Sequence, residues 1–209
     1  MNNRIKIIAS LTAFALAFAA QAVAQADSKA APAKKQPAPK IANSTGGTTP
    51  HETTSAVIDG NRVTLVYGRP FAKHPRTGEV RKVWGGLVPF GKVWRTGSDE
   101  ATLLITQQPI EMGGRTIPAG AYTLWTIPEQ DGSAKLAINR QIGQWGTDRD
   151  LKKVYDETND VARVDLKKAP ASKSADQFTM AIERNASGGG VLKMMWEDSE
   201  YSVPFTVKK

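Results

Sequence analysis

The segment Ser55-Ala-Val-Ile-Asp-Gly-Asn-Arg-Val-Thr-Leu-Val-Tyr67 decides the fold class of this 209-residue chain. At its centre, Asp59-Gly60-Asn61 is a turn signal between two short runs of strand-forming residues, which is typical of a β-hairpin. Val63, Leu65 and Tyr67 occupy every second position after the turn, so they point to one face of the second strand. The segment therefore predicts antiparallel strands with one buried face.

The same short, alternating pattern continues to the end of the chain. Further strands are expected at Ala101–Thr106, Ile110–Met112, Arg115–Ile117, Ala121–Ile127, Lys135–Asn139, Val161–Leu166, Gln177–Arg184, Val191–Glu197 and Ser202–Val207. Only Asp148–Glu157 looks helical, because Leu151, Val154 and Tyr155 have the i, i+3, i+4 spacing of a helix face. Many short strands and one short helix predict an all-β fold, a single antiparallel β-sandwich or jelly-roll-like domain.

The first 26 residues have the features of a secretory signal peptide. Arg4 and Lys6 supply the positive start, Ile7–Ala20 is an apolar run, and Ala24-Gln25-Ala26 is a small-x-small cleavage site. Because the run is shorter than the ~20 residues that a membrane span needs, we expect cleavage after Ala26 and no transmembrane span in the mature protein. We expect the protein to be exported, to the periplasm or outside the cell.

Residues 27–50 are dominated by Ala, Pro, Lys, Gly and Thr, so they cannot bury enough apolar surface to offset the entropy of ordering. We expect a disordered tether there and one domain over residues 51–209. The formal charge of +8 is divided between the leader (+2), the tether (+3) and the domain (+3). That domain charge is ordinary, and we expect no nucleic-acid partner.

Several kinds of catalytic site lack their residues. The chain has no Cys and two His, His51 at the tether boundary and His74 in a Pro-rich loop, so no zinc-ligand spacing exists. Ser98 is not part of a Gly-x-Ser-x-Gly elbow, and no Gly-rich loop leads into a helix to hold a phosphate. We therefore expect no metal, no cofactor and no nucleophilic serine chemistry.

The segment Val83–Thr102 is unusually dense in Trp, Gly and cationic residues, and it is the candidate binding region. Trp84, Trp94 and Trp145 lie beside glycines and polar residues, so they are the candidates for exposed or half-exposed positions, where each either stacks on a ligand or packs against the end of the sandwich. Trp125 and Trp196 follow strand patterns and are expected in the core. The candidate binding residues are Arg69, Trp84, Lys92, Trp94, Arg95, Thr96, Glu100 and Trp145.

The charged candidates allow more than one role. Arg69 and Arg95 have forked donors suited to a carboxylate or sulfate, or each clamps a loop carbonyl or Glu100. Asp99 and Glu100 are adjacent, and in an extended segment they would point to opposite faces and not line one cleft. Glu100 either pairs with Arg95 or Lys92 to lock the loop, or acts as the acid or base of a hydrolase.

Several longer motifs resemble one family of secreted bacterial proteins. They are Arg69-Pro70, Trp84–Gly97, Glu100-Ala101-Thr102, Ile117–Leu124, Asn139, Gln144–Thr147, Ala162–Asp165 and Val203-Pro204-Phe205. Together they resemble domain of unknown function 2911, over most of the chain from about Ser55. The family often has Ala-Asn where this chain has Ser98-Asp99, and the loop Phe71–Arg81 is longer than in many members. The resemblance implies the extent of the domain and no particular activity.

The leading hypothesis from the sequence is an exported β-sandwich that binds a ligand or partner without catalysis, because binding groups are commonly borne by loops on a rigid frame. The partner would be a glycan or an envelope protein. One alternative is a glycan or peptidoglycan hydrolase that uses Glu100, and another is a purely structural envelope protein.

Overall fold

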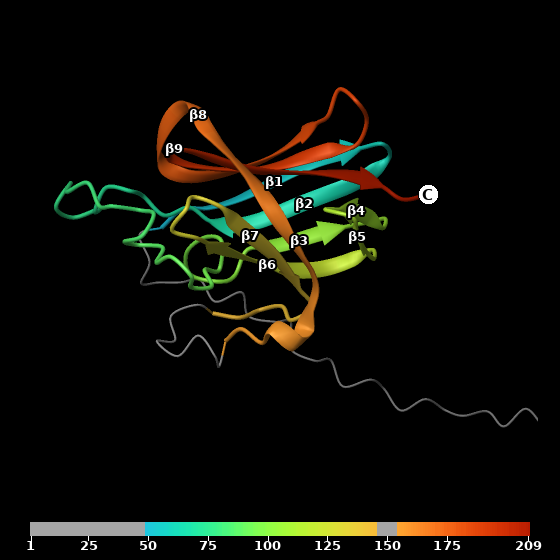
Figure 1. Cartoon of the computed structure of the whole chain (residues 1–209), viewed down its shortest axis with the longest axis horizontal. Coiled ribbons are helices and arrows are strands. Elements are labelled where there is room, and N and C mark those ends of the chain that lie inside the picture. Colours follow the sequence, from blue (N-terminus) through green and yellow to red (C-terminus); the bar gives the residue numbers. More distant parts are fainter. Residues whose placement is uncertain (1–48, 146–153) are drawn as a thin grey trace, which may run out of the picture. The chain divides into compact units, whose positions relative to one another are not determined.

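The structure, a computed structural model, describes residues 49–145 and 154–209. In these residues the fold is almost entirely β, with nine strands in one open antiparallel sheet in the order β1-β2-β3-β6-β7-β8-β9-β4-β5 (Figure 1). The strands are β1 (His51–Ile58), β2 (Asn61–Gly68), β3 (Leu103–Thr106), β4 (Ile110–Met112), β5 (Arg115–Ile117), β6 (Gly120–Pro128), β7 (Ala134–Asn139), β8 (Asp160–Arg184) and β9 (Gly190–Val207). The predicted all-β fold class is confirmed.

The first hairpin forms as the sequence predicts. Ile58 pairs with Asn61 across a two-residue loop, in which Asp59 has φ of 47° and Gly60 has φ of 85°. A two-residue loop with both backbones left-handed is the turn that matches the twist of two antiparallel strands, and Asp-Gly is one of its preferred sequences. Val63, Leu65 and Tyr67 are all buried on the inner face of β2.

One long strand folds the sheet into a sandwich-like arrangement. β8 pairs with β7 as far as Leu166 and with β9 from Lys167 onward, so it belongs to both layers, and Figure 1 shows it crossing between them. The inner faces share one core, and Tyr67 of β2 spans the layers: its hydroxyl accepts from the Met180 backbone N–H of β8 at 2.9 Å.

Two pairs of expected strands are in fact single strands. Val161–Leu166 and Gln177–Arg184 are parts of β8, and Val191–Glu197 and Ser202–Val207 are parts of β9. The intervening residues look like loop in the sequence because most of their side chains are exposed and polar. Backbone pairing between β8 and β9 holds them in the sheet, with register shifts between Pro170 and Thr179, and such pairing needs no apolar side chains.

The helix expected at Asp148–Glu157 lies mostly outside the described residues. Where the structure resumes, the only helical turn is the 3-10 helix η2 (Glu157–Asn159), which Asp156 caps by accepting from the Thr158 N–H at 2.9 Å. Within residues 49–145 and 154–209, no helix is long and apolar enough to cross a membrane.

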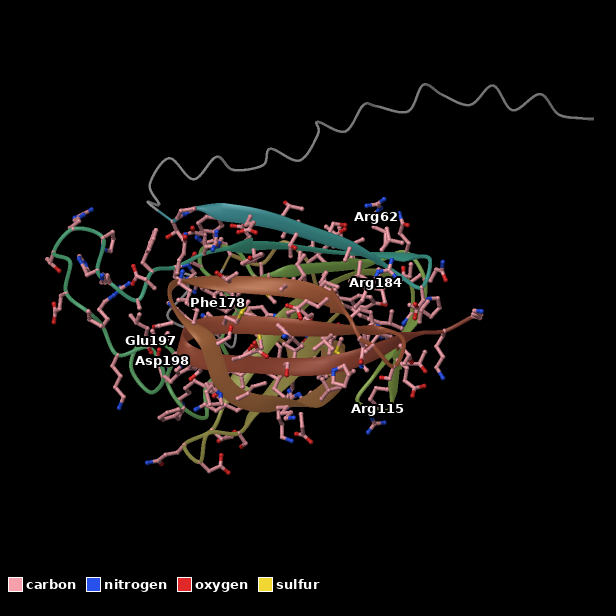
Figure 2. All side chains as sticks on the ribbon, turned by 90° about the horizontal axis from the view of Figure 1, so that it is seen from above. Arg62, Arg115, Phe178, Arg184, Glu197 and Asp198 are labelled. Atoms are coloured by element: carbon pink, nitrogen blue, oxygen red, sulfur yellow. The ribbon has the colours of Figure 1, made fainter. Side chains whose placement is uncertain are left out.

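The chain after β2 closes one end of the fold. The Phe178 N–H donates to the Pro70 carbonyl at 2.9 Å, and the Ala72 N–H donates to the Asp176 carbonyl at 2.6 Å. Figure 2 shows Phe178 toward this end, with Glu197 and Asp198, whereas Arg62, Arg115 and Arg184 lie toward the opposite end. The chain that follows Arg69 is therefore anchored to residues 176–178, within β8.

Candidate functional site

The segment Trp94–Glu100, here the 94–100 loop, is held in a strained backbone conformation. Thr96 has φ of 56° and Asp99 has φ of 66°. A positive φ is costly for a β-branched residue such as Thr, so surrounding contacts must hold it. Thr96 is fully buried, its hydroxyl lies 2.8 Å from that of Thr126, and its carbonyl accepts from the Thr102 hydroxyl at 2.6 Å.

Close backbone contact with the end of β2 fixes the same loop from the other side. A Cβ placed on Gly68 would lie 2.3 Å from the Ser98 carbonyl oxygen, and one on Gly97 would lie 2.9 Å from the Gly68 oxygen. Neither position has room for a side chain without movement of backbone. Glycine is therefore required at both positions for this packing.

An aromatic cluster lies beneath the loop. Trp94 stacks on Trp196 with ring centroids 5.7 Å apart and planes 23° apart, and Trp84 meets Trp94 edge-on at 6.1 Å. The Trp94 indole N–H donates to the Gly97 carbonyl at 3.0 Å, which ties the cluster to the loop.

The expected burial of Trp125 and Trp196 is confirmed, and Trp84 and Trp94 pack against the core. Trp125 and Trp196 are in the core, at 0% and 2% exposed, whereas Trp145 is 39% exposed. Trp84 and Trp94 are half-buried. Trp145 is brought to the loop through its backbone, which bridges to that of Glu100.

A pocket of about 170 Å³ opens beside Trp94, and we call it the tryptophan pocket. Its lining combines the apolar residues Pro70, Leu87, Val88, Trp94 and Trp196 with Arg81, Arg95, Gly97 and Ser98. The volume is below the 300 Å³ or more of a pocket for a drug-sized ligand, so it suits a single small group. Ser98 is 9% exposed, and its hydroxyl has no hydrogen-bond partner among the described residues.

Arg95 is a partly buried cation of this pocket. Burial lowers the pKa of Arg95, while the carboxylates of Asp99 and Glu100 act in the opposite direction. An arginine nevertheless stays charged in proteins. The loop thus carries a largely desolvated positive charge at the pocket wall.

The two acidic residues of the loop lie together, not on opposite faces. His51 Nε2 is 3.1 Å from Glu100 Oε2 and 3.6 Å from Asp99 Oδ2. The expectation of opposite faces was wrong because it assumed extended backbone, and the left-handed Asp99 turns the chain. Among the described residues, His51 at the start of β1 pairs with Glu100, and Arg95 lies in the field of the Asp99 and Glu100 carboxylates.

The remaining predicted residues do not all reach the pocket. Arg69 donates through Nε to the Phe178 carbonyl at 3.0 Å and pairs through Nη1 with Glu52 at 2.6 Å. It therefore clamps a carbonyl, which was one of its two expected roles. Lys92 is exposed on a turn. Of the eight candidates, Trp94 and Arg95 line the pocket, and Thr96 supports it.

Sequence reasoning missed Arg81, Leu87 and Ser98 as pocket residues. Ser98 was considered only as a nucleophile, and Arg81 only as part of a long loop. Arg81 donates to the carbonyls of Phe71 and Ala72 at 2.6 and 3.2 Å, and its Nη1 has no described acceptor. No pattern in the sequence links Arg81 to Ser98, because the folding of the whole end of the sandwich places them together.

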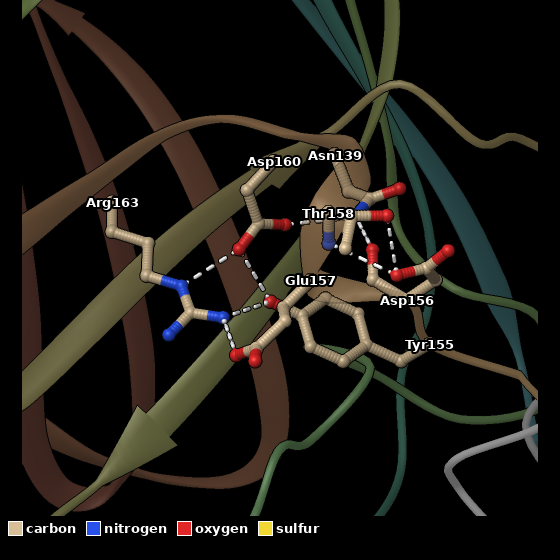
Figure 3. A network of polar contacts seen from close by, with 7 residues as sticks. All are labelled: Asn139, Tyr155, Asp156, Glu157, Thr158, Asp160 and Arg163. Carbon is tan, nitrogen blue, oxygen red and sulfur yellow. Dashed lines mark hydrogen bonds and ion pairs between the residues drawn. The ribbon is translucent and has the colours of Figure 1, made fainter.

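A second polar cluster, the Arg163 network, lies where the described chain resumes after residue 153 (Figure 3). Asp160 accepts from the Tyr155 hydroxyl at 2.6 Å, from Arg163 Nε at 2.7 Å and from Asn139 Nδ2 at 2.8 Å. Arg163 also pairs with Glu157 at 2.8 Å. Burial, together with the hydrogen bond to Asp160, raises the pKa of Tyr155 well above its ordinary value.

No group of three or more His, Asp or Glu side chains is arranged to hold a metal ion in the part of the chain that the structure describes.

Comparison with known proteins places the chain in one family. Residues 49–205 match the family model described as protein of unknown function (DUF2911), which covers well over half of the chain. The chain belongs to this family. No curated protein and no solved structure matches it.

Proposed function

We propose that this member of the DUF2911 family is an exported protein that binds a ligand at the tryptophan pocket without converting it. The observation that carries the proposal is the strained 94–100 loop, which forms one wall of a pocket in an otherwise regular sandwich. Backbone strain at a β-branched residue is costly and is concentrated at ligand-binding and active sites. In this fold the left-handed Thr96 lies between two pocket residues, Arg95 and Gly97.

The pocket has the mixed chemistry of a binding site. The Trp94 ring, stacked on Trp196, supplies a rigid apolar wall, and the lining also contains the polar side chains of Arg81, Arg95 and Ser98. Aromatic and arginine side chains supply much of the binding energy in protein interfaces. A glycan residue or a side chain of an envelope protein is the kind of group that this combination accommodates.

The chemistry of the pocket favours binding over catalysis. Its lining includes no acidic side chain and no histidine, so it offers no general base of the ordinary kinds. The hydrolase alternative requires Glu100 to work with a second carboxylate across a groove at ~5 to 9 Å. The neighbouring carboxylate, Asp99, instead faces the same imidazole as Glu100.

Chemical-shift changes in a ¹H–¹⁵N spectrum test this proposal on the purified chain. The probes are soluble peptidoglycan fragments and oligosaccharides. We expect changes at the Trp94 indole N–H and at the amides of residues 95–98, and recovery of the probe unchanged by mass spectrometry. Cleavage of a probe that is lost in Glu100→Gln would instead favour the hydrolase. Absence of any change at these residues would favour the structural role.

Export is part of the same proposal and rests on the sequence of residues 1–26, which lie outside the described residues. We expect the native protein to start at Asp27, or at Gln25, and to be recovered from the periplasm or the medium. Mass spectrometry of the native protein measures this directly, and an intact Met1 would contradict it.

A further inference from the structure

Resting on the proposed function, we infer that the tryptophan pocket selects a carboxylate carried on a small apolar or ring-shaped body. The charge of the lining gives the first argument. It contains two guanidinium groups, Arg81 and Arg95, and no acidic side chain. Arginine presents planar, forked N–H donors that match the two oxygens of a carboxylate.

The donors that remain available give the second argument. Arg81 uses Nε and Nη2 on two backbone carbonyls, so its position is fixed while Nη1 has no described acceptor. The Ser98 hydroxyl is nine-tenths buried and has no described partner. A buried donor without a partner is costly, and an oxyanion in the pocket offers acceptors for these groups.

The nearby carboxylates of Asp99 and Glu100 lie outside the lining of the pocket. They contribute to the field at Arg95, and they also contact the imidazole of His51 at 3.6 and 3.1 Å. Selectivity for the anion then depends on the body to which it is attached.

The apolar side of the pocket defines that body. Trp94 and Trp196 form a stacked wall, and Leu87, at 38% exposed, is the apolar residue at the rim. A pocket of about 170 Å³ holds one small ring or branched chain and not a long ligand. Acetate is too small to contact both the aromatic wall and Arg81, and a neutral ring offers no negatively charged acceptor to Arg81 Nη1.

Four probes separate these contributions in titrations of the purified chain, monitored at the tryptophan indole signals. Benzoate combines carboxylate and ring, benzyl alcohol lacks the charge, acetate lacks the ring, and phenyl phosphate replaces the carboxylate. We expect benzoate to bind about tenfold or more tightly than benzyl alcohol and acetate, as the loss of a charge-assisted hydrogen bond implies. Benzoate should also bind more tightly than phenyl phosphate. Equal binding of benzoate and benzyl alcohol, or tighter binding of phenyl phosphate, would overturn the inference.

A matched pair of variants at Leu87 keeps the test independent of the hydrogen bonds that hold the loops, and Arg81→Gln tests the guanidinium group itself. Leu87→Glu adds a negative charge at a partly exposed position and should weaken benzoate about fivefold relative to the matched Leu87→Gln, because like charges repel in a partly desolvated site. Arg81→Gln should weaken benzoate about tenfold, and Arg115→Gln, which Figure 2 shows toward the other end of the molecule, should leave it unchanged. Equal benzoate affinity in the two Leu87 variants would refute a role for the pocket in binding the anion.

The outcomes distinguish this inference from the proposed function. If neutral oligosaccharides shift the Trp94 indole while benzoate does not, the carboxylate inference fails and the binding function stands. If no probe of either kind shifts it, both fail.

Discussion

The Arg163 network and the 94–100 loop both contain residues of the motifs that resemble the family. They differ in how many of their buried polar groups have hydrogen-bond partners and in backbone strain. In the network, Asp160 accepts three hydrogen bonds and Arg163 has two carboxylate partners. In the loop, the buried Ser98 hydroxyl has no described partner and two residues have left-handed backbone. A network in which each polar group has a hydrogen-bond partner stabilises a fold. Backbone strain and a buried hydroxyl without a partner are instead typical of a site that binds a ligand.

The largest effect is expected in the network. Asp160→Ala removes the acceptor of the Tyr155 hydroxyl, one of the two acceptors of the buried Asn139 amide and a carboxylate partner of Arg163, so it should lower the free energy of unfolding by ~3 kcal/mol. Chemical denaturation measures this loss. The control is Asp165→Ala on the same strand, which removes only an exposed pair with Lys135 and should have little effect. Equal losses in the two variants would show that the network does not stabilise the fold.

A somewhat smaller loss is expected where the loop packs on β2. In Gly68→Ala the new Cβ would lie 2.3 Å from the Ser98 carbonyl, so the backbone must move at a cost of ~1 to 3 kcal/mol. The indole N–H of Trp94, bonded to Gly97, should shift in the NMR spectrum as the loop moves. Gly60→Ala is the control, because nothing lies within 4 Å of that Cβ and only its positive φ is penalised. An unchanged Trp94 signal in Gly68→Ala would contradict the predicted coupling.

Alkaline pH should weaken the network selectively. Because burial raises the pKa of Tyr155 in the folded state, the folded protein keeps the phenol protonated while the unfolded chain ionises near pH ~10. The stability from Tyr155 is thus fully present below that pH and is lost as the pH rises toward the folded pKa. In Tyr155→Phe the free energy of unfolding should fall less steeply above pH ~10 than in the wild type. Parallel curves for the two proteins would show that Tyr155 does not titrate differently in the two states.

The smallest effect is expected at the ion pair of the loop. The Glu100 side chain is 37% exposed and that of His51 is 32% exposed, so their coupling in a double-mutant cycle of His51→Ala and Glu100→Gln should be below ~1 kcal/mol. Denaturation of the four proteins gives this coupling. A coupling of several kcal/mol would contradict this prediction, because the His51–Glu100 pair would then stabilise the fold as much as the Arg163 network does.

Much of the fold was predictable because its signals are local. Asp59-Gly60 supplies the left-handed turn, and alternation in β2 supplies the buried face, so the hairpin follows from thirteen consecutive residues. Burial of Trp125 and Trp196 followed from strand periodicity in the same way. The length of β8 was not predictable, because its exposed central residues are kept in the sheet by pairing with β9.

The sequence by itself determined the all-β class, the family and the identity of Trp94 and Arg95 as candidate binding residues. Only the tertiary structure decided that Arg81 and Ser98 join them, and that His51 contacts Glu100. These contacts connect residues far apart in the chain, and they depend on the left-handed turn at Asp99 and on the close approach of Gly68 to Ser98. Local conformational preferences depend on neighbouring residues alone. The pocket, in contrast, forms only when β8 has joined the two layers and the chain after β2 has closed one end of the fold.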